Sequence, residues 1–111
     1  MKYFTAIYSA PPENMKEWMS KPEAERKEDS DKMMKEWNDW LAAHKESVLN
    51  SISLGKTKRV SANGVEDAQN GMMVSSYVQA ETPEAAAEIF KGHPHLQIPG
   101  ATIEIMEAQQ I

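Results

Sequence analysis

Apolar and polar positions alternate with a period of two in some stretches of the chain and follow helical spacing in others. Residues 72–80 give the clearest two-residue alternation, and residues 2–8 carry aromatic and β-branched types on both faces. Apolar groups on both faces are typical of a central strand. The pattern predicts strands over residues 2–8, 57–61, 72–80 and 101–106, a short helix over 13–19 and longer helices over 21–46 and 83–91.

Local signals mark where helices and turns begin and end. Ser20-Lys21-Pro22-Glu23 is a capping-box pattern, so the long helix is predicted to begin within it. Thr82 is predicted to cap the second long helix, and Gly92 to close it. Asn63-Gly64 predicts a type I′ turn, because both residues tolerate the positive φ that this turn requires.

The predicted order of the main elements is β-α-β-β-α-β, in a single domain over residues 1–111. This is the order of the ferredoxin-like split βαβ fold, an α+β arrangement with an antiparallel sheet and both helices on one face. The other face of the sheet would stay uncovered, although strand 2–8 has apolar groups on both sides. We therefore predict a homodimer in which two copies pack sheet to sheet.

Composition narrows the classes of function. The chain has no cysteine, 17 acidic and 12 basic residues, and a formal net charge of -5. The lack of cysteine removes thiolate chemistry and favours a reducing compartment, so we expect a cytoplasmic location. A protein that binds nucleic acid through its phosphates usually has a positively charged surface, and the excess of acidic residues argues against one here. Since no stretch resembles a membrane span or a signal peptide, we expect neither nucleic acid nor membrane as a partner.

The segment Gly92-His93-Pro94-His95-Leu96 holds two of the three histidines, at the end of a predicted helix. The negative end of the helix dipole there favours imidazolium and is expected to raise the pKa of both rings. His93 and His95 are the candidate catalytic residues, as general acid or base. The alternative is a helix stop in which a histidine binds the last free carbonyl groups. A zinc site would need a third ligand, with His44 the nearest candidate, and we predict no metal site and no cofactor.

Aromatic and basic side chains are candidates for binding a small molecule. The aromatic candidates are Trp18, Trp37, Trp40 and Tyr77. They could line an apolar pocket for a planar ligand, whereas helical spacing also fits ordinary core packing. Arg59 could meet a carboxylate or phosphate, or serve as a solvated edge-strand charge that discourages aggregation. Asp39 is the one nearby acid to consider as a histidine partner.

Over nearly its whole length the sequence resembles the YCII-related domain family. The matching stretches are the N-terminal Lys-Tyr-Phe-Thr-Ala-Ile-Tyr strand, the tryptophan-rich helix ending near His44, residues 54–60, residues 92–96 and Ile103-Glu104-Ile105. The resemblance implies a dimeric α/β barrel. Some branches of the family have a conserved histidine–aspartate pair that has suggested a small enzyme, and His93-Pro94 stands here where they carry Asp-Pro.

Two classes of function remain open. The first is a small cofactor-independent enzyme in which His93 or His95 moves a proton on an apolar or aromatic small molecule, in an isomerisation, elimination or lyase step. The second is a non-catalytic dimeric module that binds a small ligand or a partner chain, with the histidines as structural caps. The fold does not separate the two classes, but the surroundings of the two imidazole rings do.

Overall fold

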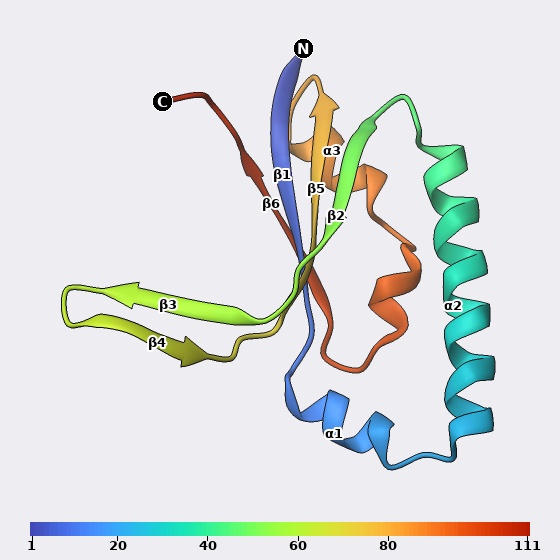
Figure 1. Ribbon diagram of the computed structural model, residues 1–111. Helices are drawn as coiled ribbons and strands as arrows, with labels where there is room; N and C mark the ends of the chain where they lie inside the picture. Colours follow the sequence, from blue (N-terminus) through green and yellow to red (C-terminus); the bar gives the residue numbers. More distant parts are fainter.

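A four-stranded antiparallel sheet forms the centre of the molecule, with a separate two-stranded hairpin beside it (Figure 1). The computed structural model describes all residues 1–111. The elements are β1 (Lys2–Ser9), α1 (Glu13–Met19), α2 (Glu23–Ala43), β2 (Val48–Ser53), β3 (Thr57–Ser61), β4 (Gly64–Ala68), β5 (Met72–Ala80), α3 (Pro83–Ile89), the 3₁₀ helix η1 (Pro94–Gln97) and β6 (Thr102–Glu107). The strand order in the main sheet is β2-β5-β1-β6. The predicted α+β class is confirmed.

The central position of β1 follows from its two apolar faces. It pairs with β5 on one side and with β6 on the other, which confirms the predicted central position. Phe4, Ala6 and Tyr8 lie on one face and are fully buried. Tyr3 and Ile7 alternate with them and therefore lie on the opposite face of the sheet.

The hydrophobic core fills the space between the sheet and the helices α2 and α3. Trp40 of α2 and the α3 region, through Ala86 and Phe90, pack on the buried face of β1 and β5. Burying one large apolar side chain stabilises a fold by about 1.5–3 kcal/mol. This core fixes the position of the chain that follows α3, which carries both candidate histidines.

The cap of α2 differs from the prediction, although the helix begins within Ser20-Lys21-Pro22-Glu23 as predicted. Ser20 Oγ donates to the carbonyl oxygen of Glu17 at 2.5 Å, so it closes α1. The N-cap of α2 is Pro22, without a side-chain hydrogen bond, and the helix has 21 residues. The capping-box prediction is wrong because the serine hydroxyl bonds the helix behind it. None of the helices combines the length and apolar character that a membrane crossing requires.

The sequence pattern did not predict β2 and β4, and these two strands change the topology. Residues 48–53 form β2, the edge of the main sheet beside β5. Residues 57–61 pair with β4 in the separate hairpin, so their expected place in the main sheet is wrong. The predicted type I′ turn is also wrong, since Gly64 has a φ of 123° but Asn63 does not have a positive φ.

The region around α3 follows its local sequence signals closely. Thr82 Oγ1 accepts a hydrogen bond from the N–H of Ala85 at 3.0 Å, which confirms the predicted cap. Gly92 has a φ of 75°, a left-handed conformation that glycine adopts without strain. The chain therefore turns sharply after α3 and enters η1.

Candidate functional site

The turn after α3 brings both candidate histidines into the protein interior. His93 is 1% exposed and His95 is 0% exposed. Pro94 lies between them and begins η1, which packs against α2. Proline cannot continue α3, so the chain reverses here and buries the two rings. Neither imidazole faces bulk solvent.

Aromatic side chains from distant parts of the sequence enclose the two imidazole rings. The centroid of the His93 ring lies 4.5 Å from that of Trp37 and 4.4 Å from that of Trp40. Tyr8 meets both histidines edge-on, at 5.1 Å from His93 and 5.5 Å from His95. We call these five residues, Tyr8, Trp37, Trp40, His93 and His95, the histidine cluster. It joins β1, α2 and the segment before β6.

Hydrogen bonds decide which ring nitrogens carry the protons. The backbone N–H of His95 donates to His93 Nδ1 at 2.9 Å, so the neutral His93 ring carries its proton on Nε2. His95 Nε2 lies 2.9 Å from the carbonyl oxygen of Ser9, which can only accept, so this nitrogen is protonated. His93 Nε2, His95 Nδ1 and Trp40 Nε1 have no hydrogen-bond partner in the protein. The cluster thus offers two unpaired donors and, in a neutral His95 ring, one unpaired acceptor.

The pKa of His93 is lowered to about 4. Burial is the main cause, because it disfavours the charged imidazolium, and the nearby His95 and His44 lower this pKa further. The predicted rise in pKa from the helix dipole is therefore wrong for His93. The ring does not bind the last carbonyl groups of α3 but accepts a bond that caps η1. At neutral pH His93 is a neutral hydrogen-bond donor.

A chain of hydroxyl groups adjoins the histidine cluster and was not predicted. Tyr8 Oη lies 2.8 Å from Ser76 Oγ, which lies 2.7 Å from Ser51 Oγ. Burial raises the pKa of Tyr8, and the hydrogen bond with Ser76 lowers it by less. The signal in the sequence was Ser76 itself, a polar residue between Val74 and Val78 on the apolar face of a strand.

Three of the predicted binding residues lie outside the histidine cluster. Trp18 belongs to α1, and Tyr77 stacks on Tyr3 at 5.4 Å on the uncovered face of the sheet. Arg59 lies on the exposed hairpin, where its Nη1 is 3.6 Å from Glu66 Oε1. Only the two tryptophans of α2 join the histidines. The predicted aromatic and basic residues therefore do not form one pocket.

His44 and Asp39 form no hydrogen bond with the unpaired ring nitrogens. His44 Nδ1 is 2.8 Å from the carbonyl oxygen of Trp40, and its ring stacks on that indole at 4.2 Å. The backbone of its own helix therefore satisfies His44 Nδ1. Asp39 is exposed and lies 3.9 Å from Lys35 Nζ, so it is not a partner of the buried histidines. No group of three or more histidine, aspartate or glutamate side chains is placed to hold a metal ion.

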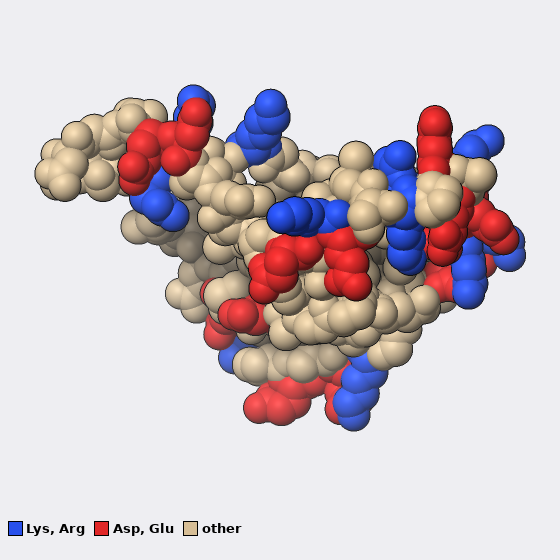
Figure 2. Space-filling model, turned by 90° about the horizontal axis from the view of Figure 1, so that it is seen from below, with Lys and Arg blue, Asp and Glu red and all other residues tan.

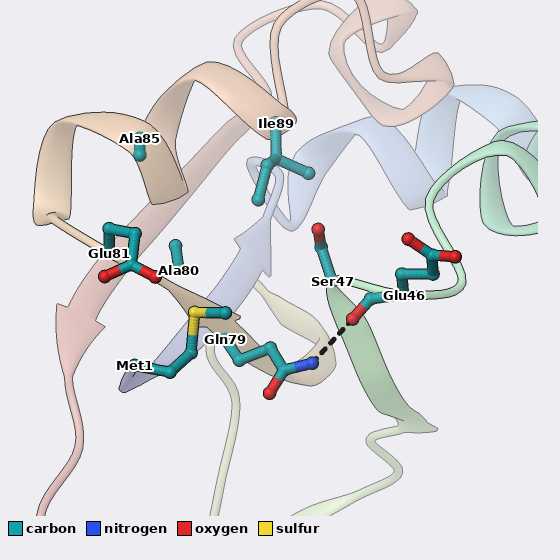
Figure 3. A pocket seen from close by; sticks show the side chains of 8 residues that line it. All are labelled: Met1, Glu46, Ser47, Gln79, Ala80, Glu81, Ala85 and Ile89. Atoms are coloured by element: carbon teal, nitrogen blue, oxygen red, sulfur yellow. Dashed lines mark hydrogen bonds between the residues drawn. The ribbon is translucent and has the colours of Figure 1, made fainter.

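Two surface pockets lie outside the histidine cluster. The larger has a volume of about 390 Å³ and lies where β1 begins and β5 ends (Figure 3). It is lined by Met1, Glu46, Ser47, Gln79, Ala80, Glu81, Ala85 and Ile89. Gln79 Nε2 donates to the carbonyl oxygen of Glu46 at 2.7 Å across this pocket (Figure 3). The second, of about 170 Å³, lies between α3 and β6, and neither pocket is lined by His93 or His95.

Comparison of the chain with protein-family models gives no match, and comparison with curated proteins gives none either. Function is therefore inferred from the chemistry of the histidine cluster.

Proposed function

We propose that this protein is a small cofactor-independent enzyme that moves a proton on an apolar or aromatic small molecule. The observation that carries the proposal is the complementary pair of unpaired ring nitrogens inside the aromatic cluster. His95 Nδ1 can accept a proton, and the Nε2–H of His93 can donate a hydrogen bond to an oxygen that gains negative charge. Abstraction of a proton next to a carbonyl group, as in an isomerisation, needs this combination.

The surroundings of the two nitrogens support this chemistry. A pKa of about 4 keeps His93 neutral across physiological pH, so it serves as a donor without bringing a positive charge. A buried polar group without a partner costs about 1–3 kcal/mol. A substrate that bonds both nitrogens offsets this cost. The water-poor site also strengthens hydrogen bonds to developing charge.

Because both rings are buried, entry of a substrate requires movement of η1 away from α2. One exposed side-chain bond joins these elements, from Gln97 Nε2 to Glu36 Oε2 at 2.7 Å. Asn14 Nδ2 donates to the carbonyl oxygen of Pro99 at 2.7 Å and ties the next loop to α1. Hydrogen bonds of this kind contribute only about 0.5–1.5 kcal/mol each. Because η1 also carries His95, its opening breaks the bond from His95 Nε2 to the carbonyl oxygen of Ser9 and exposes the ring, so the open state is short-lived and closure on the substrate restores the histidine cluster.

The test follows proton exchange on carbon. The protein is incubated in D₂O with a panel of small aliphatic and aromatic ketones and keto acids, and ¹H NMR follows the loss of the signals next to the carbonyl. We expect the wild type to accelerate exchange for at least one compound. His95→Gln removes the basic nitrogen that takes up the proton but retains an N–H donor for Ser9, and is expected to abolish exchange. His93→Asn keeps an acceptor for the backbone N–H of His95, but its shorter side chain places no donor at the position of Nε2, so it lowers kcat more than KM.

Leu96→Ala is the matched control, because Leu96 belongs to η1 but its side chain is exposed. We expect this variant to exchange the same protons at the wild-type rate. Circular dichroism and the ¹H–¹⁵N spectrum establish that each variant is folded. Equal exchange rates in the wild type and in both histidine variants would contradict an enzymatic role of the cluster.

A non-catalytic small-ligand module is the second candidate function. The observation in its favour is the open pocket of about 390 Å³, which lies apart from the histidines (Figure 3). In the same NMR panel, a compound that shifts the resonances of Ser47 and Gln79 without any proton exchange would favour this module. Such a ligand would bind equally well to the histidine variants.

We further propose that two copies form a dimeric α/β barrel of the ferredoxin-like type, as the resemblance to the YCII-related family implies. The strand order supports this, since β5 lies between β1 and β2, and β1 lies between β5 and β6. The face of the sheet away from the core carries Ile7, Ile52 and Met106, for which one chain provides no cover. Light scattering at micromolar concentration tests the proposal, and a stable monomer would contradict it. A cytoplasmic location stays a prediction.

A further inference from the structure

The hairpin of β3 and β4 projects from the body of the protein as an arm. In Figure 1 it extends to the left of the sheet, whereas α2 lies to the right. Figure 2 shows it from below, again projecting, with charges of both signs at its base and an uncharged tip. Its two strands pair only with each other, and residues 58–67 are all exposed. The rest of the chain therefore does not cover the side chains of residues 58–67.

Each face of the arm carries one cross-strand ion pair, and the face with Lys58 and Asp67 also carries an exposed valine pair. Val60 lies opposite Val65, and these side chains are 77% and 69% exposed. One step along the hairpin, Arg59 pairs with Glu66 on the other face. A two-stranded hairpin is only marginally stable in water, and exposed ion pairs add at most about 1 kcal/mol. The valine face is thus the surface through which another molecule can stabilise the arm.

We propose that the arm packs through Val60 and Val65 on the body of a second copy of this chain. This inference rests on the proposed homodimer. The arm extends on the side of the sheet opposite α2, which is the side where a second copy would cover the exposed sheet face (Figure 1). A two-fold symmetric dimer repeats each contact, so each arm holds the other body.

The arm adds to the surface that the sheet face offers to a second copy. Four strands about 4.8 Å apart, with six to nine residues each at about 3.4 Å, give a face with a projected area of roughly 460 Å². A stable protein interface removes about 800 Å² from each partner. The arm enlarges the surface that each copy offers, and it does so with a β-branched pair suited to packing on a flat surface.

A pair of double variants separates the arm from the sheet face. Val60→Lys with Val65→Glu continues the cross-strand charge pairs of the hairpin, so the strands stay paired while the apolar face is lost. The matched control is Arg59→Thr with Glu66→Thr, which changes the opposite face of the same hairpin. Sedimentation velocity over a dilution series measures the dimer dissociation constant. We expect the valine variant to raise it by about tenfold or more and the control to leave it within about threefold.

A cross-link at the tip tests the contact directly. The chain has no cysteine, so Asn63→Cys introduces a unique thiol. A cross-linker with a maleimide at one end and an amine-reactive ester at the other then joins this thiol to nearby lysine side chains. Mixing ¹⁴N and ¹⁵N protein distinguishes links between copies from links within one copy. We expect mixed-isotope peptide pairs that join the tip to the body of the other copy.

The outcomes distinguish this inference from the proposals on which it rests. A dimeric wild type with an equally tight valine variant, or with tip links only inside one copy, would overturn the role of the arm and leave the homodimer standing. A monomeric wild type would overturn both the homodimer and the arm. Proton exchange by the histidine cluster is measured separately, so neither result depends on it.

Discussion

The chemistry of His93 is set by what surrounds its ring. Tryptophan rings lie against it, and its Nδ1 accepts a backbone N–H. An imidazole in such a place is neutral at physiological pH and offers one donor in a fixed direction. The same side chain at an exposed helix end would gain and lose its proton near neutral pH. Burial therefore changes His93 from a pH-sensitive group into a constant hydrogen-bond donor.

The lowered pKa of His93 predicts a loss of stability in mild acid. The folded state has a pKa of about 4 against an ordinary value of 6.5, so between these values the unfolded chain binds a proton that the folded protein does not. Stability contributed by this group is complete above pH 6.5 and is lost as the pH falls toward 4, by about 3 kcal/mol in total. Urea unfolding at pH 7, 5.5 and 4 measures the loss.

His93→Asn is the control, because asparagine can accept the N–H of His95 but does not titrate. Its stability is expected to depend less steeply on pH between 7 and 4. An NMR titration of the His93 ring with a midpoint near 6.5 in the folded protein would contradict the prediction.

Ser76 is expected to matter more than Ser51, although the two hydroxyls touch. Ser76→Ala leaves the buried Tyr8 hydroxyl without its partner, which costs about 1–3 kcal/mol. Ser51→Ala leaves the Tyr8–Ser76 bond intact and removes a half-buried hydroxyl, so the cost is about 1 kcal/mol or less. Urea unfolding at pH 7 measures both. Equal losses of stability in the two variants would show that the Tyr8–Ser76 hydrogen bond does not account for the cost of Ser76→Ala.

At the scale of elements, local signals succeeded where neighbouring residues alone decide the structure. The two-faced pattern of β1 and the Thr82 cap of α3 are formed as predicted. The signals failed where two elements compete for one group, as at Ser20, which bonds the helix before it. They also failed for β2, whose mixed polarity reflects an edge position that only the assembled sheet defines.

Where β1 ends and β5 begins, position 71 has room only for glycine. The N–H of Ala10 donates to the carbonyl oxygen of Gly71 at 2.9 Å. A Cβ at position 71 would lie 2.3 Å from the carbonyl oxygen of Ala10, so the backbone would have to move. Gly71→Ala is expected to lower the free energy of unfolding by about 2–3 kcal/mol. Gly55→Ala is the control, because its Cβ meets open space and is expected to change stability by less than about 1 kcal/mol.

Thermal unfolding followed by circular dichroism compares the two glycine variants. A Gly71→Ala protein as stable as Gly55→Ala would show that β1 and β5 separate at this point without cost.

At the scale of the whole molecule, the sequence predicted which residues meet in the candidate site but not that their rings are buried. His93, His95 and the tryptophans of α2 were chosen from spacing and from the helix end, and they do meet. The full burial of the two imidazole rings could not be predicted, because it depends on how three segments far apart in the chain pack together. Tyr77 and Arg59 were misplaced for the same reason, since the face of a residue is known only once the sheet is assembled.

The proposed dimer predicts that two equally exposed apolar residues respond differently to a charge. Ile52 on the uncovered sheet face is 52% exposed, and Met15 on α1 is 54% exposed. In a monomer, glutamate at either position changes little, because surface substitutions usually alter stability by less than about 0.5 kcal/mol. In the dimer, Ile52→Glu buries a charge against the second copy, whereas Met15→Glu stays in water.

We therefore expect Ile52→Glu to raise the dimer dissociation constant by about tenfold or more and Met15→Glu to leave it unchanged. Sedimentation equilibrium measures the constant. The melting temperature of the wild type should rise with protein concentration, because association stabilises the folded state by mass action. Ile52→Glu should remove that dependence and Met15→Glu should keep it. If both variants melt alike at every concentration, the sheet face is not where two copies meet.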